Sequence, residues 1–255
     1  MTGTNKMNNF LKQSEKNWNN LAKEDPLWAI LSDSSKKRGK WKIKDFFESG
    51  KKEITELFNF LNKNKVNVNF GRTLDFGCGV GRLSNPLASM FSQVFGVDIS
   101  SKMVELAKCY SQYPEDKLCF LVNKVDNLDI FQDNFFDFIY TNITLQHIKQ
   151  DFALKYIDSF LKKIKKDGIV VFQVESFKKN ITGTCKDFLK TVLSPIINLL
   201  RENRINMYYI DIQKINKLIL RNNCKVLLVD KKEIKTIYGT IFSYIYVLKS
   251  DRINH

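Results

Sequence analysis

Cysteine and histidine are scarce in this chain, and their scarcity argues against several kinds of site. The 255 residues include five cysteines, of which no two form a C-x-x-C pair. The sequence therefore favours neither a disulfide framework nor a zinc site. The two histidines, His147 and His255, are too few for a histidine-based metal centre, so we expect no bound metal.

Long apolar runs are also missing. No stretch approaches the roughly 18–20 consecutive apolar residues that cross a bilayer, and residues 1–18 lack the apolar core of a secretory signal. We therefore expect a cytoplasmic protein without a membrane span. Hydrophobic residues still make up 44% of the chain, which is enough to bury a sizeable core.

The chain is strongly basic, with a formal net charge of +14. This charge is compatible with an anionic partner, such as RNA or a phosphorylated metabolite, and equally with a lysine-rich composition that has no specific partner. The lysines are scattered and no RNA-binding motif accompanies them, so nucleic acid is not the expected partner. The densest basic run spans 36–42, where we would look first for binding of a phosphorylated acceptor.

Residues 1–70 and 71–255 differ in their hydrophobic pattern. The first region is polar and carries apolar residues at helical spacing, which predicts a helical cap, or lid, over a cleft. In the second region, short apolar runs alternate with helical segments. Residues 176–222 combine a stretch without a regular pattern and a helix over 208–222, and we interpret them as an insertion on the acceptor side.

The alternation in 71–255 predicts a Rossmann-like α/β fold, in which helices cover both faces of a mostly parallel sheet. The connection after KVLLVD is too short for a crossover helix, so the last strand should run antiparallel to its neighbour. The expected strands, seven in all, are 72–76, 93–98, 118–122, 135–141, 168–175, 225–230 and 236–248. Helices are expected over 81–91, 101–111 and 150–165.

A glycine-rich turn, LDFGCGVGR (74–82), joins the first predicted strand to the first predicted helix. Glycine permits the tight turn, and a ligand can then lie against backbone N–H groups at the start of the helix. A dinucleotide site requires G-x-G-x-x-G. Arg82 occupies the position of the third glycine, so nicotinamide and flavin cofactors are disfavoured.

Two acidic residues accompany this turn. Asp98 ends the second predicted strand, where a carboxylate can accept hydrogen bonds from both ribose hydroxyls of an adenosine. Its alternative role is to cap the helix that follows. Asp75 lies two residues before the first glycine, and its alternative role is to stabilise the turn.

Four segments together resemble the class I S-adenosylmethionine-dependent methyltransferases: LDFGCGVGRLS, FGVDIS, IYTNITLQHI and KKDGIVVFQ. The resemblance covers residues 71–175 and implies S-adenosyl-L-methionine as cofactor. It places Asp75 and the glycine loop at the methionine end and Asp98 at the ribose. The residues that we assign to cofactor binding are Asp75, Gly77, Cys78, Gly79, Gly81, Asp98, Ile99, Met103, Val125, Asp126 and Thr141.

The segment after the third strand departs from the family pattern. Lys124 occupies the position where an acidic residue commonly meets the adenine amino group. Either Asp126 substitutes from two residues away, or backbone groups near Val125 hold the adenine. Ile99 and Met103 are expected to pack near the same ring.

A weaker resemblance concerns the first 50 residues, where NWNNLAKEDPLWAIL, KKRGKW and DFFESG are similar to methyltransferases of bacterial surface-polysaccharide biosynthesis. This resemblance implies a small-molecule acceptor, a sugar or glycan-related metabolite, methylated on oxygen or nitrogen. The basic charge keeps an RNA methyltransferase as an alternative. A second alternative is a non-catalytic partner subunit that binds S-adenosylmethionine. Nothing in the sequence indicates an oligomeric state.

Methyl transfer from a sulfonium requires mainly that two reactants be positioned and water excluded. An oxygen nucleophile benefits from a general base, and His147, after the fourth predicted strand, is our candidate for the catalytic residue. The alternative is a structural role in its loop. Asn142 and Gln146 are candidates for orienting a hydroxyl or an amine.

Overall fold

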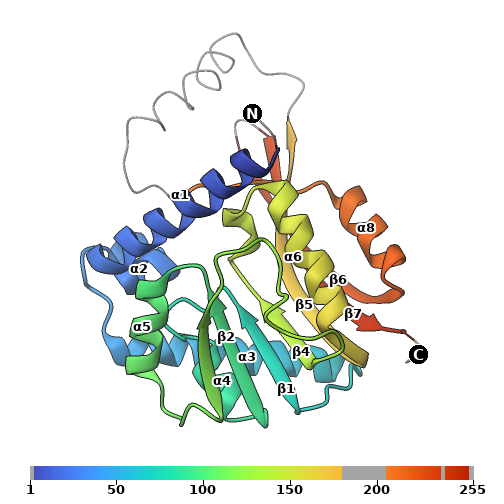
Figure 1. The fold of residues 1–255 in the computed structure, drawn as a ribbon, viewed down its shortest axis with the longest axis horizontal. Helices are drawn as coiled ribbons and strands as arrows, with labels where there is room; N and C mark the ends of the chain where they lie inside the picture. Colours follow the sequence, from blue (N-terminus) through green and yellow to red (C-terminus); the bar gives the residue numbers. More distant parts are fainter. Residues whose placement is uncertain (1–2, 180–204, 237–238, 253–255) are drawn as a thin grey trace.

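The computed structural model describes residues 3–179, 205–236 and 239–252. Most of the unpatterned part of the predicted insertion lies outside these ranges, as do Cys185 and His255. The described part of the chain forms an α/β structure built around one large sheet (Figure 1).

Seven strands form this sheet in the order β3-β2-β1-β4-β5-β7-β6. Their bounds are β1 Arg72–Phe76, β2 Gln93–Asp98, β3 Leu118–Val122, β4 Phe136–Thr141, β5 Ile164–Lys179, β6 Cys224–Thr236 and β7 Gly239–Ser250. β7 is antiparallel to both of its neighbours, and the pairs among β1 to β5 are all parallel. The predicted Rossmann-like sheet with an antiparallel last strand is confirmed.

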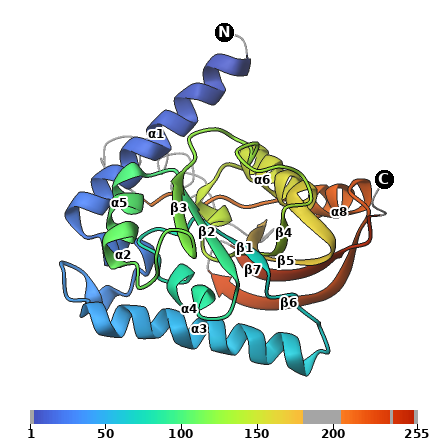
Figure 2. The ribbon, with the colours of Figure 1, turned by 60° about the horizontal axis from the view of Figure 1, so that its bottom comes forward.

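Helices cover both faces of the sheet (Figure 2). One face carries α3 (Ile43–Lys63), α4 (Ser84–Ala88) and α5 (Ser101–Tyr110). The other carries α6 (Gln150–Lys163) and α8 (Ile212–Arg221). The two cores follow from the period of two along each strand. In β5, Ile169 and Val171 face α3, whereas Val170 and Phe172 face α6.

The N-terminal helices α1 (Gly3–Glu24) and α2 (Pro26–Ile30) lie across the edge of the sheet where the parallel strands end (Figure 1). Leu21, Ala22 and Leu27 pack with Met103 of α5 in a third apolar cluster. Asn19 fixes the position of α1 by accepting hydrogen bonds from the Ser100 hydroxyl and the Lys102 N–H. The boundary at residue 70 between a helical cap and the Rossmann-like domain stays a prediction. Helix α3, which precedes this boundary, packs in one core with the sheet.

Several element boundaries differ from the prediction. The last two strands are β6 Cys224–Thr236 and β7 Gly239–Ser250 rather than 225–230 and 236–248, and the helix expected over 208–222 is α8 Ile212–Arg221. The helix predicted over 81–91 is only α4, because Gly81 has a φ of +84° and begins a turn that a right-handed helix cannot include. β5 begins at Ile164 rather than at 168 and includes the KKDG turn, where Asp167 adopts a φ of +60°. The left-handed conformation of Gly81 thus explains the later start of α4, whereas that of Asp167 lies within β5.

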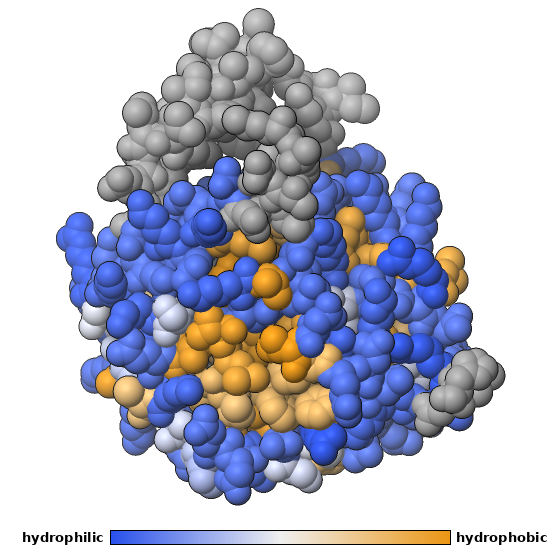
Figure 3. Space-filling model, viewed as in Figure 1, coloured by the Kyte–Doolittle hydropathy of each residue, from blue (hydrophilic) through white to orange (hydrophobic). Residues whose placement is uncertain are grey.

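The connection from β3 to β4 (123–135) contains no helix among the described residues. The face of β2 and β3 beside it therefore stays partly open, and Figure 3 shows apolar surface gathered there. Phe95, Leu121 and Phe135 are only partly buried on this face. Across the described ranges, every helix is too short or too polar to cross a bilayer.

Phe138 of β4 offers a test of how α3 packs on the sheet. Its buried ring lies 5.6 Å from the ring of Phe58 on α3 and 5.4 Å from that of Phe91. We expect Phe138→Ala to lower the free energy of unfolding by about 3–5 kcal/mol, measured by urea denaturation, because it leaves a cavity between sheet and helix. Phe70→Ala, at a ring that is 42% exposed, should cost less. Equal losses in the two variants would contradict this packing.

Candidate functional site

The glycine turn between β1 and α4 is in close contact with two other loops. Gly77 has a φ of +76°, and a Cβ there would lie 2.2 Å from the Thr144 side chain. Gly79 has a φ of +53°, and a Cβ there would lie 2.5 Å from the side chain of Ile30. A larger residue at either position would force the side chain of Thr144 or of Ile30 to move. The turn therefore serves as the meeting point of the elements that enclose the site.

The N–H groups of this turn are used within the protein. Those of Gly77 and Cys78 both donate to the carbonyl of Val97, and that of Gly79 donates to the Asp98 carboxylate at 3.0 Å. Our expectation that a ligand would bind these N–H groups is therefore not supported for these three residues. What the glycines provide is close approach to the backbone.

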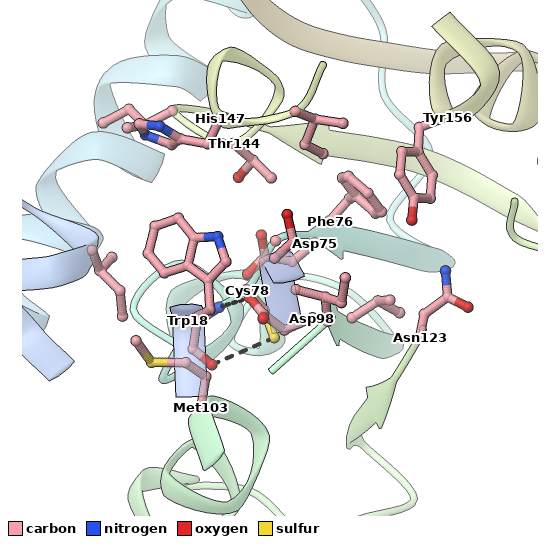
Figure 4. Close-up of a pocket in the computed structure, with 18 of the residues that line it drawn as sticks. Trp18, Asp75, Phe76, Cys78, Asp98, Met103, Asn123, Thr144, His147 and Tyr156 are labelled. Carbon is pink, nitrogen blue, oxygen red and sulfur yellow. Dashed lines mark hydrogen bonds between the residues drawn. The ribbon is translucent and has the colours of Figure 1, made fainter. Parts of the chain in front are cut away.

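A cavity opens between this turn, the ends of β2 and β4, and α1 (Figure 4). Most of the predicted site residues line it together: Asp75, Gly77, Cys78, Gly79, Asp98, Ile99, Met103 and His147. Residues from three separate stretches of sequence thus meet at the edge where ligands bind in open α/β sheets.

Two predicted residues, Thr141 and Gly81, lie outside the lining. The Thr141 hydroxyl donates to the carbonyl of Phe76 at 2.8 Å and is buried, so it ties β4 to the end of β1. Gly81 packs beneath the ring of Phe120. Both residues contribute to the frame of the cavity rather than to its surface.

Val125 and Asp126 also lie outside the lining. The Val125 carbonyl accepts a hydrogen bond of 2.5 Å from the hydroxyl of Tyr156, and the Asp126 carboxylate pairs with Lys155. Their assignment to the adenine stays a prediction. Lys124 points toward α1, where its ammonium pairs with Glu15 at 2.7 Å.

The sequence analysis missed several residues that line the cavity, most of them aromatic or amide side chains: Phe10, Trp18, Asn123, Ile143, Thr144 and Tyr156. Trp18 lies on the apolar face of α1, and nothing in the helical pattern separates a residue that faces a cavity from one in a core. Asn123 precedes Lys124 and is buried, with its amide donating to the carbonyls of Val125 and Asn127.

Asp98 keeps the geometry that a ribose site requires. Its carboxylate accepts hydrogen bonds from the Gly79 N–H and, at 2.8 Å, from the Ser100 N–H. Each carboxylate oxygen can accept a further bond, so two hydroxyl groups can still bind. Burial raises the pKa of Asp98, and the hydrogen bonds from Ser100 and Gly79 oppose that rise.

Asp75 is buried beside the glycine turn and is 2% exposed. Burial raises its pKa to about 7, although the Ser84 hydroxyl donates to it at 2.5 Å and favours the charged form. Because the folded-state pKa lies above the unfolded value, the neutral carboxyl stabilises the ligand-free fold at low pH. That stability is lost as the pH rises through about 7.

His147 stands in the 3-10 turn η2 (Leu145–His147), with its edge toward the ring of Trp18 at 5.7 Å. Its Nδ1 lies 2.7 Å from the carbonyl of Asn206, and its Nε2 lies 3.3 Å from the amide nitrogen of Gln146. Burial lowers the pKa of His147 and favours the neutral ring, whereas the bond to Asn206 opposes this.

His147 also lines a second cavity, which shares Phe10, Ser14 and Trp18 with the first. Amide, aromatic and basic side chains surround this second cavity, among them Gln13, Asn17, Lys149, Asn206 and Tyr208. The imidazole therefore stands at the junction of the two spaces.

Comparison with known proteins identifies the domain. A family model described as a methyltransferase domain matches residues 74–172. The chain is 27% identical over 191 residues to the ubiquinone biosynthesis O-methyltransferase of Pelagibacter ubique, covering 69% of this chain and 77% of that protein. The chain carries a methyltransferase domain and is an S-adenosylmethionine-dependent methyltransferase.

Other relatives agree with this assignment. The methyltransferase is 28% identical to an uncharacterized methyltransferase of Bacillus cytotoxicus over 48% of this chain, and it spans only 55% of that relative. Its fold is similar to the crystal structure of magnesium protoporphyrin IX methyltransferase from Synechocystis with bound S-adenosylhomocysteine, with a TM-score of 0.59 and 20% identity. That match covers 92% of this chain and 98% of the other.

The cavity of the methyltransferase fits S-adenosylmethionine. The turn at Gly77 and Gly79 has no side chains that would block close approach, and Asp98 retains lone pairs for two hydroxyls. Asp75 is a buried carboxyl for a cationic methionine end. When bound, the cofactor supplies the methyl group and its own sulfonium leaving group.

The raised pKa of Asp75 predicts that cofactor binding depends on pH. A cationic ligand favours the carboxylate, so we expect the affinity for S-adenosylmethionine to increase as pH rises from about 5.5 to about 7.5, by up to roughly tenfold per unit. Isothermal titration across this range measures the slope. In Asp75→Asn the slope should be absent. An equal slope in both proteins would assign the dependence to another group.

Proposed function

We propose that this methyltransferase transfers its methyl group to an oxygen, or to a nitrogen, of a small molecule that occupies the second cavity, and that the acceptor is a sugar or a glycan-related metabolite. The observation that carries this proposal is the second cavity itself, which meets the first at His147 and Trp18. Methyl transfer requires the two reactants to approach in line at such a junction.

The side chains around the second cavity suit a hydroxyl-bearing ring. Gln13, Asn17 and Asn9 supply amide groups that can both donate and accept, as several hydroxyl groups on one molecule require. The rings of Phe10 and Tyr208 supply apolar faces against which a sugar ring can lie. Lys149 is basic and suits an anionic substituent on the acceptor.

The relative from Pelagibacter ubique supports a second candidate acceptor. That protein is named as an O-methyltransferase of ubiquinone biosynthesis, which favours oxygen over nitrogen and makes a phenolic hydroxyl an alternative to a sugar hydroxyl. The amide side chains of the second cavity favour the sugar, because they can donate to and accept from the several hydroxyl groups that a sugar carries. An RNA acceptor has less support, because lysines on this chain are scattered.

The proposed roles of the protein's own groups are positioning and proton acceptance. Asp75 and Asp98 hold the two ends of the cofactor, and the rings of Trp18 and Phe10 exclude water from the junction. His147 accepts the proton of the attacking hydroxyl. Residues 1–70 act as the cap, because α1 contributes Phe10 and Trp18 to both cavities.

The first measurement is isothermal titration with S-adenosylmethionine and S-adenosylhomocysteine. We expect micromolar binding of both, at least about tenfold weaker in Asp98→Ala, because charge-assisted hydrogen bonds to the ribose are lost. Asp116→Ala, at an exposed carboxylate, is the matched control and should bind as the unmodified protein does.

The second measurement identifies the acceptor. Transfer of labelled methyl from S-adenosylmethionine is followed for nucleotide-sugars, free glycans and catechols. Labelling of a sugar supports the proposal, and labelling of catechols alone would replace it by the phenolic alternative. Labelling of RNA alone would contradict a small-molecule acceptor.

A further inference from the structure

A chain of hydrogen bonds leads from strand β7 to the imidazole of His147. The amide nitrogen of Gln173 donates to the hydroxyl of Ser243 at 3.0 Å and to the side-chain oxygen of Gln146 at 3.2 Å. The amide nitrogen of Gln146 then meets Nε2 of His147. Both glutamine side chains are buried, each 8% exposed, so their polar atoms have little access to water.

The orientation of this chain is fixed at one end by a backbone N–H. The N–H of Ile143 donates to the side-chain oxygen of Gln173 at 2.9 Å. A backbone N–H only donates, so the oxygen of Gln173 must face Ile143 and its nitrogen must face Gln146. Ile143 holds a φ of +60°, a strained conformation for a β-branched residue, and this conformation places it in the cavity wall.

The remaining orientations follow one from another. Gln146 meets the nitrogen of Gln173 and therefore presents its oxygen there, which turns its own nitrogen toward His147. Nε2 of His147 must then accept. At the other end the carbonyl of Asn206 only accepts, so Nδ1 of His147 must carry the proton. Two backbone groups thus determine the same tautomer from opposite ends.

We propose that Gln146 and Gln173 are positioning residues that hold His147 neutral, protonated on Nδ1, with Nε2 as its proton-accepting atom at the junction of the two cavities. The catalytic meaning of this arrangement rests on the proposed function, whereas the tautomer does not. In the ligand-free protein the amide nitrogen of Gln146 lies 3.3 Å from Nε2 of His147. An acceptor hydroxyl that replaces Gln146 as the donor meets a lone pair that is already oriented. The hydroxyl proton would move to Nε2 as the oxygen bonds to the methyl carbon; the bond from this carbon to the sulfonium breaks, which leaves neutral S-adenosylhomocysteine and an imidazolium.

Protonation of Nε2 is unfavourable in the ligand-free protein, because it would bring two donors together at Gln146. No charged side chain among the described residues hydrogen-bonds to the imidazole. The titratable groups that line the two cavities around it are Asp75, Cys78, Arg82, Asp98, Tyr156, Lys149 and Tyr208. The resistance to protonation therefore comes from the amide of Gln146 and from burial.

Nuclear magnetic resonance of the ring nitrogens tests the tautomer without any substrate. The chain has two histidines, so His255→Gln leaves a single imidazole to observe. Long-range proton–nitrogen correlations should show the proton of His147 on Nδ1 at neutral pH. A proton on Nε2, or a mixture of tautomers, would overturn the proposal whatever the enzyme methylates.

Substitutions then test the two glutamines. Gln146→Met removes the donor at Nε2 without changing charge, and we expect the pKa of His147 to rise by about half a unit or more. Gln173→Glu forces Gln146 to turn its oxygen toward Nε2, and the rise should exceed one unit. Gln93→Glu, on a partly exposed side chain at the start of β2, is the matched control and should leave the pKa of His147 unchanged. An unchanged pKa in folded Gln146→Met would contradict the positioning role.

Enzyme kinetics separate this proposal from the proposed function. Once an acceptor is known, the acid limb of the pH profile of kcat should move upward with the pKa of His147 in Gln146→Met, with KM for S-adenosylmethionine unchanged. A moved pKa with an unmoved profile would exclude His147 as the base and leave the tautomer intact. Nuclear magnetic resonance thus tests the tautomer of His147, and the pH profile of kcat tests its catalytic role.

Discussion

The close contact of the glycine turn with its two neighbours is the constraint on which the rest of the site depends. A Cβ at Gly77 would meet Thr144, and one at Gly79 would meet Ile30. Through these contacts the turn fixes the distance between the loop after β4, which carries His147, and α2, which continues from α1. Because the turn's own N–H groups donate to Val97 and Asp98, it also joins β1 to β2. The cavity thus depends on backbone approach more than on any one side chain.

The N-terminal region is bound to this frame by polar contacts around the cofactor cavity. Asn19 bonds to the first turn of α5, and Glu15 pairs with Lys124 beyond β3. Lys124, at the position where the family resemblance implies an acidic residue, is therefore used to hold α1. An exposed ion pair contributes little stability by itself, so the apolar cluster around Met103 must supply most of the docking energy. Apolar packing and polar contacts together thus hold α1 so that Trp18 lies where the two cavities meet.

Local sequence patterns were sufficient for the sheet and for the central part of the site. Runs such as LCFLV identify buried strands, and the glycine turn with Asp98 identifies a cofactor edge, because these signals lie within a few residues. The start of helix α4 was harder, since Gly81 adopts a left-handed conformation that the pattern does not reveal. Residues such as Trp18 and Gln173 reach the site only through tertiary packing, and a buried glutamine in a strand carries no local sign that it will orient a histidine.

Asp75 and His147 line the same cavity, but the proposed function requires Asp75 to be charged and His147 to be neutral. Burial favours the neutral form of Asp75 and also that of His147. A cationic cofactor reverses the preference at Asp75, because a carboxylate gains more from the cation than it loses by burial. The same cation disfavours an imidazolium nearby, so His147 should remain able to accept a proton while the cofactor is bound. Under the proposed function, loss of the sulfonium charge on methyl transfer would remove that opposition and favour protonation of Nε2. In this proposal, the charge of the cofactor thus couples methyl transfer to proton transfer onto His147.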